Sequence, residues 1–452
     1  MGKLFGTDGI RGVVNAGLDA DLAYRVGLAA ATVLAKGKKA GEKPLVTIGK
    51  DTRISGDLLK GSLIAGLCTA GADVLDLGTL PTPGVAWVTV YEKADAGIVI
   101  SASHNPFEHN GIKIFNGEGF KLSDDLEEKI EEIVLFSHNN IPMKTHGEIG
   151  KVSYVAERAS EDYIDHLENC VDSTLGGLRI LVDCANGAAS ATAARLFGRF
   201  SKLRADVINA DPDGININAN CGSTHIEALA AMVKAGGYDV GIAFDGDADR
   251  CLAADEQGTL IDGDQIIAAC ALDMKKNGKL SGDTLVGTVM SNLGLHLWAK
   301  EQGIALECTD VGDRNVLELM VEKGYAIGGE QSGHTIFLEH ATTGDGELTA
   351  LKILALMKES GKKASEIFGA CRRCPQVLIN VPVADNDAKK AIMASETLWN
   401  AVREEEARLA DKGRVLVRPS GTEALMRVMV EAADEKTAQD CAARLADLVR
   451  TL

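Results

Sequence analysis

The sequence has few of the features that mark secreted or membrane-anchored proteins. It has only nine prolines in 452 residues, and no stretch approaches the ~18 uninterrupted apolar residues that a membrane-spanning helix needs. Residues 1–8 lack the apolar core of a secretory signal, and Gly6 stands where a myristoylation motif requires serine or threonine. We therefore expect a cytoplasmic protein without a membrane anchor. Because no linker is rich in proline, we also expect its domains to pack against one another.

An excess of positive charge is missing as well. The chain has 65 Asp and Glu against 47 Lys and Arg, which gives a formal net charge of −18 at pH 7. This overall field would repel a nucleic acid or an anionic membrane, so neither is expected as a partner. An anionic small molecule would need a local group of basic residues.

The cysteines do not form a recognisable disulfide or zinc pattern. Ten cysteines are scattered through the chain, and without a secretory signal they are best interpreted as small buried apolar side chains. Cys371 and Cys374 are close in sequence, but a zinc ribbon needs a second pair at similar spacing and none exists. We predict no metal or redox role for this pair.

A repeated strand–helix–strand unit is the main structural signal in the sequence. The composition, 46% hydrophobic and 25% charged, is that of a globular protein, and the length suggests about two to four domains. The unit occurs three times, over residues 45–77, 179–208 and 285–308, with helices expected at 58–70, 188–200 and 293–302. This order of elements predicts successive α/β domains rather than a solenoid of short repeats.

The pattern changes after about residue 375. The sequence there predicts a strand, a long helix, two strands and a last helix, at residues 376–381, 388–409, 414–417, 425–430 and 438–449. We therefore predict an α/β protein with three similar α/β/α domains, built on mixed sheets, and a smaller C-terminal α+β domain. The predicted domains cover residues 1–155, 156–256, 257–370 and 371–452.

Three alternating carboxylates directly follow an apolar strand predicted at 240–244: Asp245, Asp247 and Asp249. Because such close carboxylates repel one another, a hard divalent cation is the natural reason for their grouping. A calcium-binding EF-hand would have glycine where Arg250 stands and a helix on each side. An aspartyl-phosphate phosphatase would use the first Asp as its nucleophile. Both alternatives stay open, although three carboxylates without an obvious nucleophile favour a metal site.

A serine turn follows another apolar strand, predicted at 98–100. Residues 101–106 are Ser-Ala-Ser-His-Asn-Pro, and Pro106 ends regular structure, so a capped turn without a catalytic role is one interpretation. Lys113 brings a cation near the same strand end and favours an anion-binding role for Ser103. A hydrolase triad is not expected, because the chain has no Gly-x-Ser-x-Gly motif here.

Two further loops combine basic residues with glycine turns. Residues 6–12, Gly-Thr-Asp-Gly-Ile-Arg-Gly, include Arg11. Residues 418–422, Arg-Pro-Ser-Gly-Thr, lie between two predicted strands and offer a guanidinium, two hydroxyls and several backbone N–H groups. Such groups can hold a phosphate, although a simple hairpin turn explains the second loop equally well.

Together with residues 329–334, Gly-Glu-Gln-Ser-Gly-His, these loops resemble the motifs of the α-D-phosphohexomutase superfamily. The motifs occur in the family's order, and the resemblance covers essentially the whole chain. It implies a four-domain phosphosugar mutase, an isomerase in which Ser103 becomes a phosphoserine. It also implies that Ser103, Asp245, Asp247 and Asp249 hold Mg²⁺.

The resemblance implies roles for other residues too. Lys113 and His334 are the candidates for general base and acid, and Arg11 and Arg250 would supply fixed positive charge. Glu330 and Ser332 would bind hydroxyls of the sugar. The phosphate that is not reacting would be held by Arg418, Ser420, Gly421 and Thr422.

The sugar loop is similar to that of the branch of the family that acts on glucosamine phosphate, because Gln331 stands where mannose and glucose mutases usually have Met. Ser101, where Thr is commoner, is a departure that keeps the hydroxyl. The implied reaction converts glucosamine 6-phosphate reversibly to glucosamine 1-phosphate through glucosamine 1,6-bisphosphate, a step of amino-sugar metabolism that leads to UDP-N-acetylglucosamine. A phosphomannomutase or phosphoglucomutase is the alternative. The small-molecule partner would be the phosphosugar substrate, and a homodimer is possible.

Overall fold

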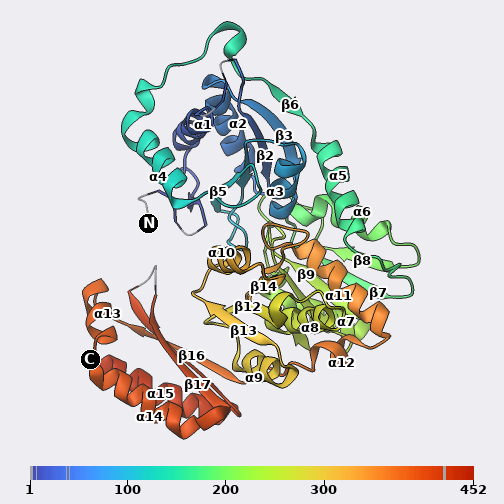
Figure 1. Cartoon of the computed structure of the whole chain (residues 1–452), viewed down its shortest axis with the longest axis vertical. Coiled ribbons are helices and arrows are strands. Elements are labelled where there is room, and N and C mark those ends of the chain that lie inside the picture. Colours follow the sequence, from blue (N-terminus) through green and yellow to red (C-terminus); the bar gives the residue numbers. More distant parts are fainter. Residues whose placement is uncertain (1–3, 7, 37, 40, 421–423) are drawn as a thin grey trace. The chain divides into compact units, whose positions relative to one another are not determined.

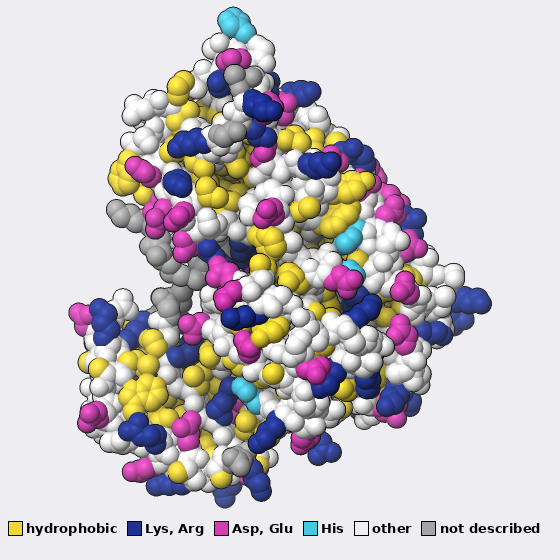
Figure 2. Space-filling view, viewed as in Figure 1, with side chains coloured by type: hydrophobic (Ala, Val, Ile, Leu, Met, Phe, Trp, Pro, Cys, Tyr) yellow, Lys and Arg dark blue, Asp and Glu magenta, His cyan; other side chains and the backbone are white. Residues whose placement is uncertain are grey.

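The computed structural model describes residues 4–6, 8–36, 38–39, 41–420 and 424–452. Its strands form four sheets. The contacts divide the chain into two compact units, one made of Met1–Met290 and Ala305–Ala370 and the other of Ser291–Ile304 and Cys371–Leu452. Within the described ranges, no helix is both long and apolar enough to span a bilayer. On the face shown in Figure 2, cationic and anionic side chains are interspersed.

The first sheet is mixed and has six strands. Their order is β1 (Ile10–Val13), β5 (His109–Asn116), β4 (Ala96–Ile100), β2 (Leu45–Lys50), β3 (Asp73–Thr79) and β6 (Val152–Tyr154). Strands β2, β3, β4 and β6 run parallel, and β5 is antiparallel to both β4 and β1. The predicted strand–helix–strand unit at 45–77 corresponds to β2, α2 and β3.

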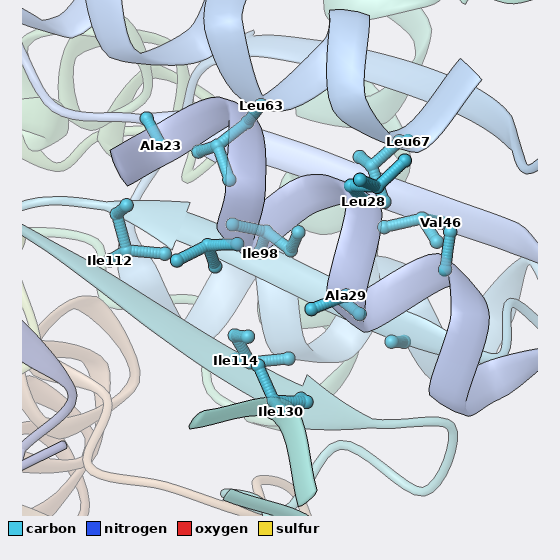
Figure 3. Close-up of a cluster of buried hydrophobic side chains, with 14 of the residues drawn as sticks. Ala23, Leu28, Ala29, Val46, Leu63, Leu67, Ile98, Ile112, Ile114 and Ile130 are labelled. Carbon is cyan, nitrogen blue, oxygen red and sulfur yellow. The ribbon is translucent and has the colours of Figure 1, made fainter. Parts of the chain in front are cut away.

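Helices lie on both faces of this sheet (Figure 1). They are α1 (Ala20–Leu34), α2 (Gly56–Thr69), α3 (Thr82–Tyr91), α4 (Asp124–Glu132) and α5 (Ala156–Asn169). Because side chains alternate along a strand, Val46 and Ile48 join the apolar cluster of α1 and α2, whereas Thr47 bonds Thr89 of α3 at 2.6 Å. Figure 3 shows this cluster, with Leu28, Leu63 and Leu67 packed over Val46 and Ile98.

The second sheet positions the acidic loop. Its strand order is β11 (Leu260–Ile261), β10 (Cys251–Asp255), β9 (Val240–Phe244), β7 (Arg179–Asp183) and β8 (Arg204–Ile208), with α7 (Ile226–Gly236) packed against it. Strands β7, β8 and β9 are parallel, and β10 runs antiparallel to β9. The helix predicted at 188–200 is wrong in form, since a 3₁₀ turn (Ala188–Ala191) precedes a short helix α6 (Ala193–Gly198). The break lies at Thr192, a buried β-branched residue whose hydroxyl bonds Glu347 at 2.8 Å.

The third sheet has the order β13 (Ala305–Thr309), β12 (Thr284–Thr288), β14 (Ile327–Gly329) and β15 (Thr335–Phe337). Its helices are α8 (Gly263–Lys276), α10 (Asp313–Lys323), α11 (Gly346–Ser360) and α12 (Ala364–Phe368). Helix α9 (Leu293–Gln302) connects β12 to β13 in the sequence, yet by its contacts it belongs to the second unit.

The second unit contains an antiparallel sheet with the order β16 (Gln376–Pro382), β18 (Leu425–Ala432) and β17 (Gly413–Pro419). Its other helices are α13 (Asn386–Met393), α14 (Glu396–Leu409) and α15 (Glu435–Thr451), and Figure 1 shows α14 beside α15. The single helix predicted at 388–409 is wrong. The segment breaks at Ser395, whose side chain accepts the Leu398 N–H at 3.4 Å, because serine at this place caps a new helix.

A buried carboxylate ties α9 to the C-terminal sheet. Glu431 of β18 is fully buried and accepts hydrogen bonds from Asn292 Nδ2 at 2.9 Å and from the Leu293 N–H at 2.8 Å, at the N-terminus of α9. Arg414 neutralises this carboxylate with Nη2 at 2.9 Å and donates to the Ser291 carbonyl at 2.8 Å. The contacts of α9 with the rest of the second unit therefore include a buried carboxylate that is neutralised by an arginine and accepts hydrogen bonds.

Helix α11 begins with two buried acids. Asp345 caps the helix by accepting the Leu348 N–H at 2.9 Å, and it also accepts the Tyr163 hydroxyl at 2.8 Å. Glu347 has one oxygen on Thr192, while its other oxygen has no hydrogen-bond partner among the described residues. Burial raises the pKa of Asp345 to about 6 and that of Glu347 to about 8. Both acids thus hold their protons more tightly in the folded protein.

The close crossing of α1 and α2 predicts opposite effects for two glycine substitutions in one helix. A methyl group at Gly66 would overlap the Tyr24 carbonyl oxygen, whereas nothing lies within 4 Å of one at Gly61. We expect Gly66→Ala to destabilise the first unit by about 1–3 kcal/mol, because the helices must separate. The control Gly61→Ala should leave stability unchanged or raise it by up to ~1 kcal/mol through helix propensity. Thermal unfolding midpoints of the two variants test this, and equal midpoints would contradict it.

Glu347 should make stability fall as the pH rises. Its pKa is raised from 4.5 to about 8, so between these values the folded chain binds more protons than the unfolded chain and loses stability with increasing pH. Glu347→Gln keeps a neutral side chain, so its unfolding midpoint should match the wild type near pH 5 and exceed it near pH 8. The matched control is Glu359→Gln, an exposed position of the same helix. Parallel curves of midpoint against pH for wild type and Glu347→Gln would rule out the raised pKa.

Candidate active site

The acidic loop connects the antiparallel strands β9 and β10. Asp245, Asp247 and Asp249 are all buried, and one oxygen from each lies within 4.8 Å of the others. Strand β9 is buried along its whole length, so it fixes the start of the loop. Because strands rather than helices flank the loop on both sides, the EF-hand interpretation is wrong.

The electrostatics of this loop fit a hard divalent cation. Burial, together with repulsion from Asp249 and Asp247, raises the pKa of Asp245 well above its usual range. Although burial opposes it, the Lys113 ammonium and the Thr82 hydroxyl lower the pKa of Asp247. One oxygen of Asp247 and one of Asp249 are buried without a partner among the described residues. Such carboxylates are the ligands that Mg²⁺ and Ca²⁺ use, and a cation would relieve their repulsion.

Ser103 lies against this loop. It is 2% exposed, and its hydroxyl donates to Asp245 Oδ2 at 2.5 Å. Its backbone is left-handed, with φ +52°, which is unfavourable for serine and is typical of functional turns. Ser101 holds it there by accepting the Ser103 N–H at 2.9 Å. Gly246 allows the two loops to approach, since a Cβ there would lie 2.6 Å from the Ser103 carbonyl oxygen.

Sequence reasoning missed the residues that hold the serine turn. Arg53 is 1% exposed and donates from Nη2 to the carbonyls of Ser103 and Asn105, both at 2.8 Å. Asp51 pairs with its Nε at 2.9 Å and accepts the Ser101 hydroxyl at 2.7 Å. The signal was available, because Asp51 and Arg53 follow β2 as the serines follow the adjacent parallel strand β4, and such strand ends share one edge of the sheet.

Lys113, predicted as an acid–base candidate, is buried among carboxylates. Its Nζ lies 3.1 Å from Asp247 Oδ2, 3.3 Å from Asp8 Oδ2 and 3.6 Å from Asp249 Oδ2. Although burial opposes the charge, these carboxylates raise the pKa of Lys113, so the side chain is an ammonium. Arg11 of β1 forms an ion pair with the same Asp8 oxygen. The structure thus brings both predicted cations to the edge of the acidic loop.

A second chain of charges, also missed from the sequence, joins this region to α10. Lys121 Nζ lies 2.7 Å from Asp8 Oδ1 and 2.7 Å from Asp313 Oδ2. Asp313 Oδ2 in turn lies 3.4 Å from Nε2 of His334. The two acid–base candidates, Lys113 and His334, are therefore linked through Asp8, Lys121 and Asp313. No sequence pattern connects these residues, because they come from four separate segments.

The predicted sugar loop lies between β14 and β15. His334 is buried, its Nε2 accepts the Gly344 N–H at 3.3 Å, and its Nδ1 has no partner among the described residues. Glu330 accepts the Gly312 N–H at 3.1 Å, and Ser332 is exposed. Gln331 donates from Nε2 to Asp262 at 3.2 Å, which leaves its amide oxygen as an acceptor.

Arg250 lies at the end of the acidic loop. Its backbone N–H donates to Asp245 Oδ1 at 3.3 Å, and its Nε is 3.9 Å from Asp249 Oδ1. That Nε is buried without a hydrogen-bond partner among the described residues. The guanidinium therefore retains a donor for an anion near the loop.

The predicted phosphate cradle is in the second unit. Arg418 is in β17, opposite Arg427 of β18, and the Ser420 carbonyl accepts Lys389 Nζ at 2.8 Å. Burial, and then the charge of Arg427, lower the pKa of Arg418. Gly421 and Thr422 lie outside the described residues. Arg427 and Lys389 were missed from the sequence, although both add positive charge beside the predicted turn.

Comparison with known families agrees with this architecture. The phosphoglucomutase/phosphomannomutase family models match four consecutive parts of the chain. These are alpha/beta/alpha domain I at residues 2–139, domain II at 161–258, domain III at 262–373 and the C-terminal domain at 378–448. They confirm the predicted fold class of three α/β/α domains followed by a different C-terminal domain.

Curated relatives are similar over their full length. A phosphoglucosamine mutase of Acetivibrio thermocellus is 53% identical over 436 residues, which are 96% of each chain. That of Geobacillus thermodenitrificans is 49% identical over 452 residues, covering 100% of this chain and 99% of the relative.

Solved structures share the fold. A phosphoglucomutase/phosphomannomutase family protein of Burkholderia thailandensis superposes with a TM-score of 0.78 at 23% identity, over 99% of this chain and 97% of its own. The Aspergillus fumigatus N-acetylphosphoglucosamine mutase, in complex with GlcNAc-6P and magnesium, gives 0.72 at 19% identity, over 99% and 95%. On the strength of the four matched domains and the full-length relatives, this chain belongs to the phosphoglucomutase/phosphomannomutase family.

Proposed function

We propose that the protein converts glucosamine 6-phosphate and glucosamine 1-phosphate into each other through a phosphoserine enzyme. The observation that carries this proposal is the Ser103 hydroxyl, held 2.5 Å from Asp245 at the rim of a buried acidic loop. A serine in that place can bear a phosphoryl group beside a bound cation. The full-length relatives named phosphoglucosamine mutase support the choice of sugar.

The residues we propose for Mg²⁺ are Asp245, Asp247 and Asp249, with the phosphorylated Ser103 as a further ligand. When bound, the ion supplies charge neutralisation and Lewis-acid polarisation of the transferring phosphoryl group. The magnesium complex of the Aspergillus fumigatus enzyme supports this choice of metal. Arg250, with its unpaired donor, adds positive charge on the same side.

In the transfer step, the bond between Ser103 Oγ and phosphorus breaks while a sugar hydroxyl oxygen bonds to that phosphorus. The proton of the hydroxyl goes to a base, and Ser103 Oγ is left as the acceptor for the return transfer. Of the two candidates, we propose that His334 takes this proton and that Lys113, which is already an ammonium, is the acid that returns one. Lys113 is surrounded by carboxylates, and His334 has an open Nδ1. Arg11 fixes Asp8 between these groups.

The product of the first transfer is glucosamine 1,6-bisphosphate, which must turn round before the other phosphate returns to Ser103. We assign Glu330 and Ser332 to the sugar hydroxyls. We assign Arg418, Ser420, Gly421 and Thr422 to the phosphate that is not reacting, and Arg427 and Lys389 strengthen the positive charge there. The cradle must accept either phosphate, because the sugar binds in two orientations.

The four domain ranges (1–155, 156–256, 257–370 and 371–452) are kept as our proposed division of the chain. A cytoplasmic location, a homodimer and the absence of nucleic-acid or membrane partners stay predictions from the sequence.

Ser103→Ala should abolish mutase turnover, by at least a factor of about 10³, because it removes the group that carries the phosphoryl. The thermal unfolding midpoint should change little, since the hydroxyl contributes only two hydrogen bonds, with Asp245 and with His104. The intact mass of the wild-type protein should include a phosphoryl group that the variant lacks. The control is Ser332→Ala, which should keep the added mass. A folded Ser103→Ala variant with near-normal turnover would exclude the phosphoserine mechanism.

Glucosamine phosphate should be preferred over the neutral sugars by a factor of ~10–1000 in kcat/KM. An ammonium at the 2-position is favoured near the Glu330 carboxylate and the Gln331 amide oxygen, whereas a hydroxyl still finds a partner there. Glucosamine 6-phosphate, glucose 1-phosphate and mannose 1-phosphate should be compared with bisphosphate activator present. Gln331→Met should lower the ratio of kcat/KM for glucosamine phosphate to kcat/KM for the neutral sugars. If the wild type converts a neutral sugar phosphate with an equal kcat/KM, the assignment to glucosamine phosphate is wrong and only membership of the wider mutase family remains.

A further inference from the structure

A basic hollow lies at the amino-terminal ends of β7 and β8. It is shallow, has a volume of about 770 Å³, and is lined by four cationic residues, Arg179, Lys202, Arg204 and Lys358. Thr174 and Ser201 add hydroxyl groups, and two glycines, Gly176 and Gly177, complete the lining. Among the described residues that line it there is no carboxylate, although Asp206 lies 3.5 Å from Arg179. This concentration of positive charge is unexpected in a chain with a net charge of −18.

Three of the four cations, Lys202, Arg204 and Lys358, form no ion pair with a carboxylate within the described part of the chain. Lys202 and Arg204 are also exposed, and their side chains have no other partner among the described residues that fixes them. The charge is thus available to a ligand.

The other two cations are held in place. Arg179 donates to the Gly236 carbonyl at 2.6 Å, and its guanidinium lies 4.2 Å from the centre of the Tyr238 ring. Its ion pair with Asp206 is long, at 3.5 Å. Lys358 donates to the Gly176 carbonyl at 2.6 Å. Side chains fixed in this way lose little conformational entropy when an anion binds.

This hollow is separate from the candidate active site. Strands β7, β8 and β9 are parallel, and the acidic loop follows the carboxyl end of β9, whereas Arg179 and Arg204 are the first residues of β7 and β8. The two sites therefore lie at opposite ends of the parallel strands of one sheet. Five residues of strand at about 3.3 Å each put roughly 15 Å of buried sheet between them.

We propose that this hollow binds the diphosphate group of a small molecule. Arg179 and Arg204 are register partners on neighbouring parallel strands, so their Cα atoms are about 5 Å apart and their side chains leave the sheet on the same face. Guanidinium groups bind phosphate oxygens in pairs, and the lysines add charge at the sides. A long polyanion such as a nucleic acid would also meet the acidic remainder of the surface, which disfavours it.

Calorimetric titration with inorganic pyrophosphate tests this site. The test variant is Lys202→Ala/Arg204→Ala, and the matched control is Lys36→Ala/Lys300→Ala, which removes two exposed lysines elsewhere. We expect two binding events in the wild type, one at the mutase site and one here. The dissociation constant of the second event should rise by at least a factor of about 10 in the test variant and stay unchanged in the control. The mutase activity of the test variant, measured without pyrophosphate, should equal that of the wild type and show that it is folded.

Hydrogen exchange locates the bound pyrophosphate independently of the calorimetric titration. Pyrophosphate should protect amides in residues 174–179 and 201–204 of the wild type, and not in the test variant. Equal protection by ADP would show that a nucleotide can supply the diphosphate. The proposal is overturned if the test variant keeps the second binding event, if no second event exists, or if a 15-nucleotide DNA strand binds the hollow more tightly than pyrophosphate.

Discussion

Three carboxylates that repel one another within one buried loop are the constraint on which the first unit depends. Burial makes their repulsion strong, and the protein offsets only part of it, chiefly through Lys113. The surrounding structure keeps the loop rigid enough to withstand it. Strand β9 fixes its beginning, β10 its end, and the N–H of Gly346 bonds the Ala248 carbonyl at 2.9 Å. A cation bound among the three carboxylates, as we propose, would relieve this repulsion.

The elements next to the loop serve the same constraint. Ser103 contacts Asp245 from a left-handed turn, and the buried Arg53 holds that turn by donating to the Ser103 carbonyl. Helix α11 starts at the loop and extends for 15 residues, about 22 Å, to the basic hollow at the far edge of the sheet. Lys358 is in its last turn. One helix thus extends from the acidic loop to the basic hollow.

Local patterns in the sequence predicted the strands and turns whose conformation depends on residues close together in the chain. The strand at 240–244, the acidic loop after it and the serine turn all follow from apolar runs that end in polar residues. Long-range polar contacts could not be read in this way. Arg53 looks like an ordinary exposed charge in sequence, and only the fold shows that it is buried under the serine turn. The chain of Lys121 and Asp313 was equally invisible, because it depends on how separate segments pack.

The errors in secondary structure have the same origin. Ser395 was counted as part of a long amphipathic helix, although its capping bond divides that helix in two. Thr192 interrupts the helix expected at 188–200 because it bonds a glutamate 155 residues away. In both cases a side-chain hydroxyl forms a hydrogen bond at the point where the helix breaks. The periodicity of the apolar residues does not reveal such a bond.

The place of α9 affects how the C-terminal unit could be separated from the rest. This helix interrupts the third sheet in sequence, yet Glu431 and Arg414 hold it to the second unit. A fragment that starts at Cys371 would lose α9 and leave a buried carboxylate without two of its donors. The C-terminal unit is therefore not an autonomous module at the level of the gene. Recombination between family members would conserve its packing only if residues 291–304 were exchanged together with residues 371–452.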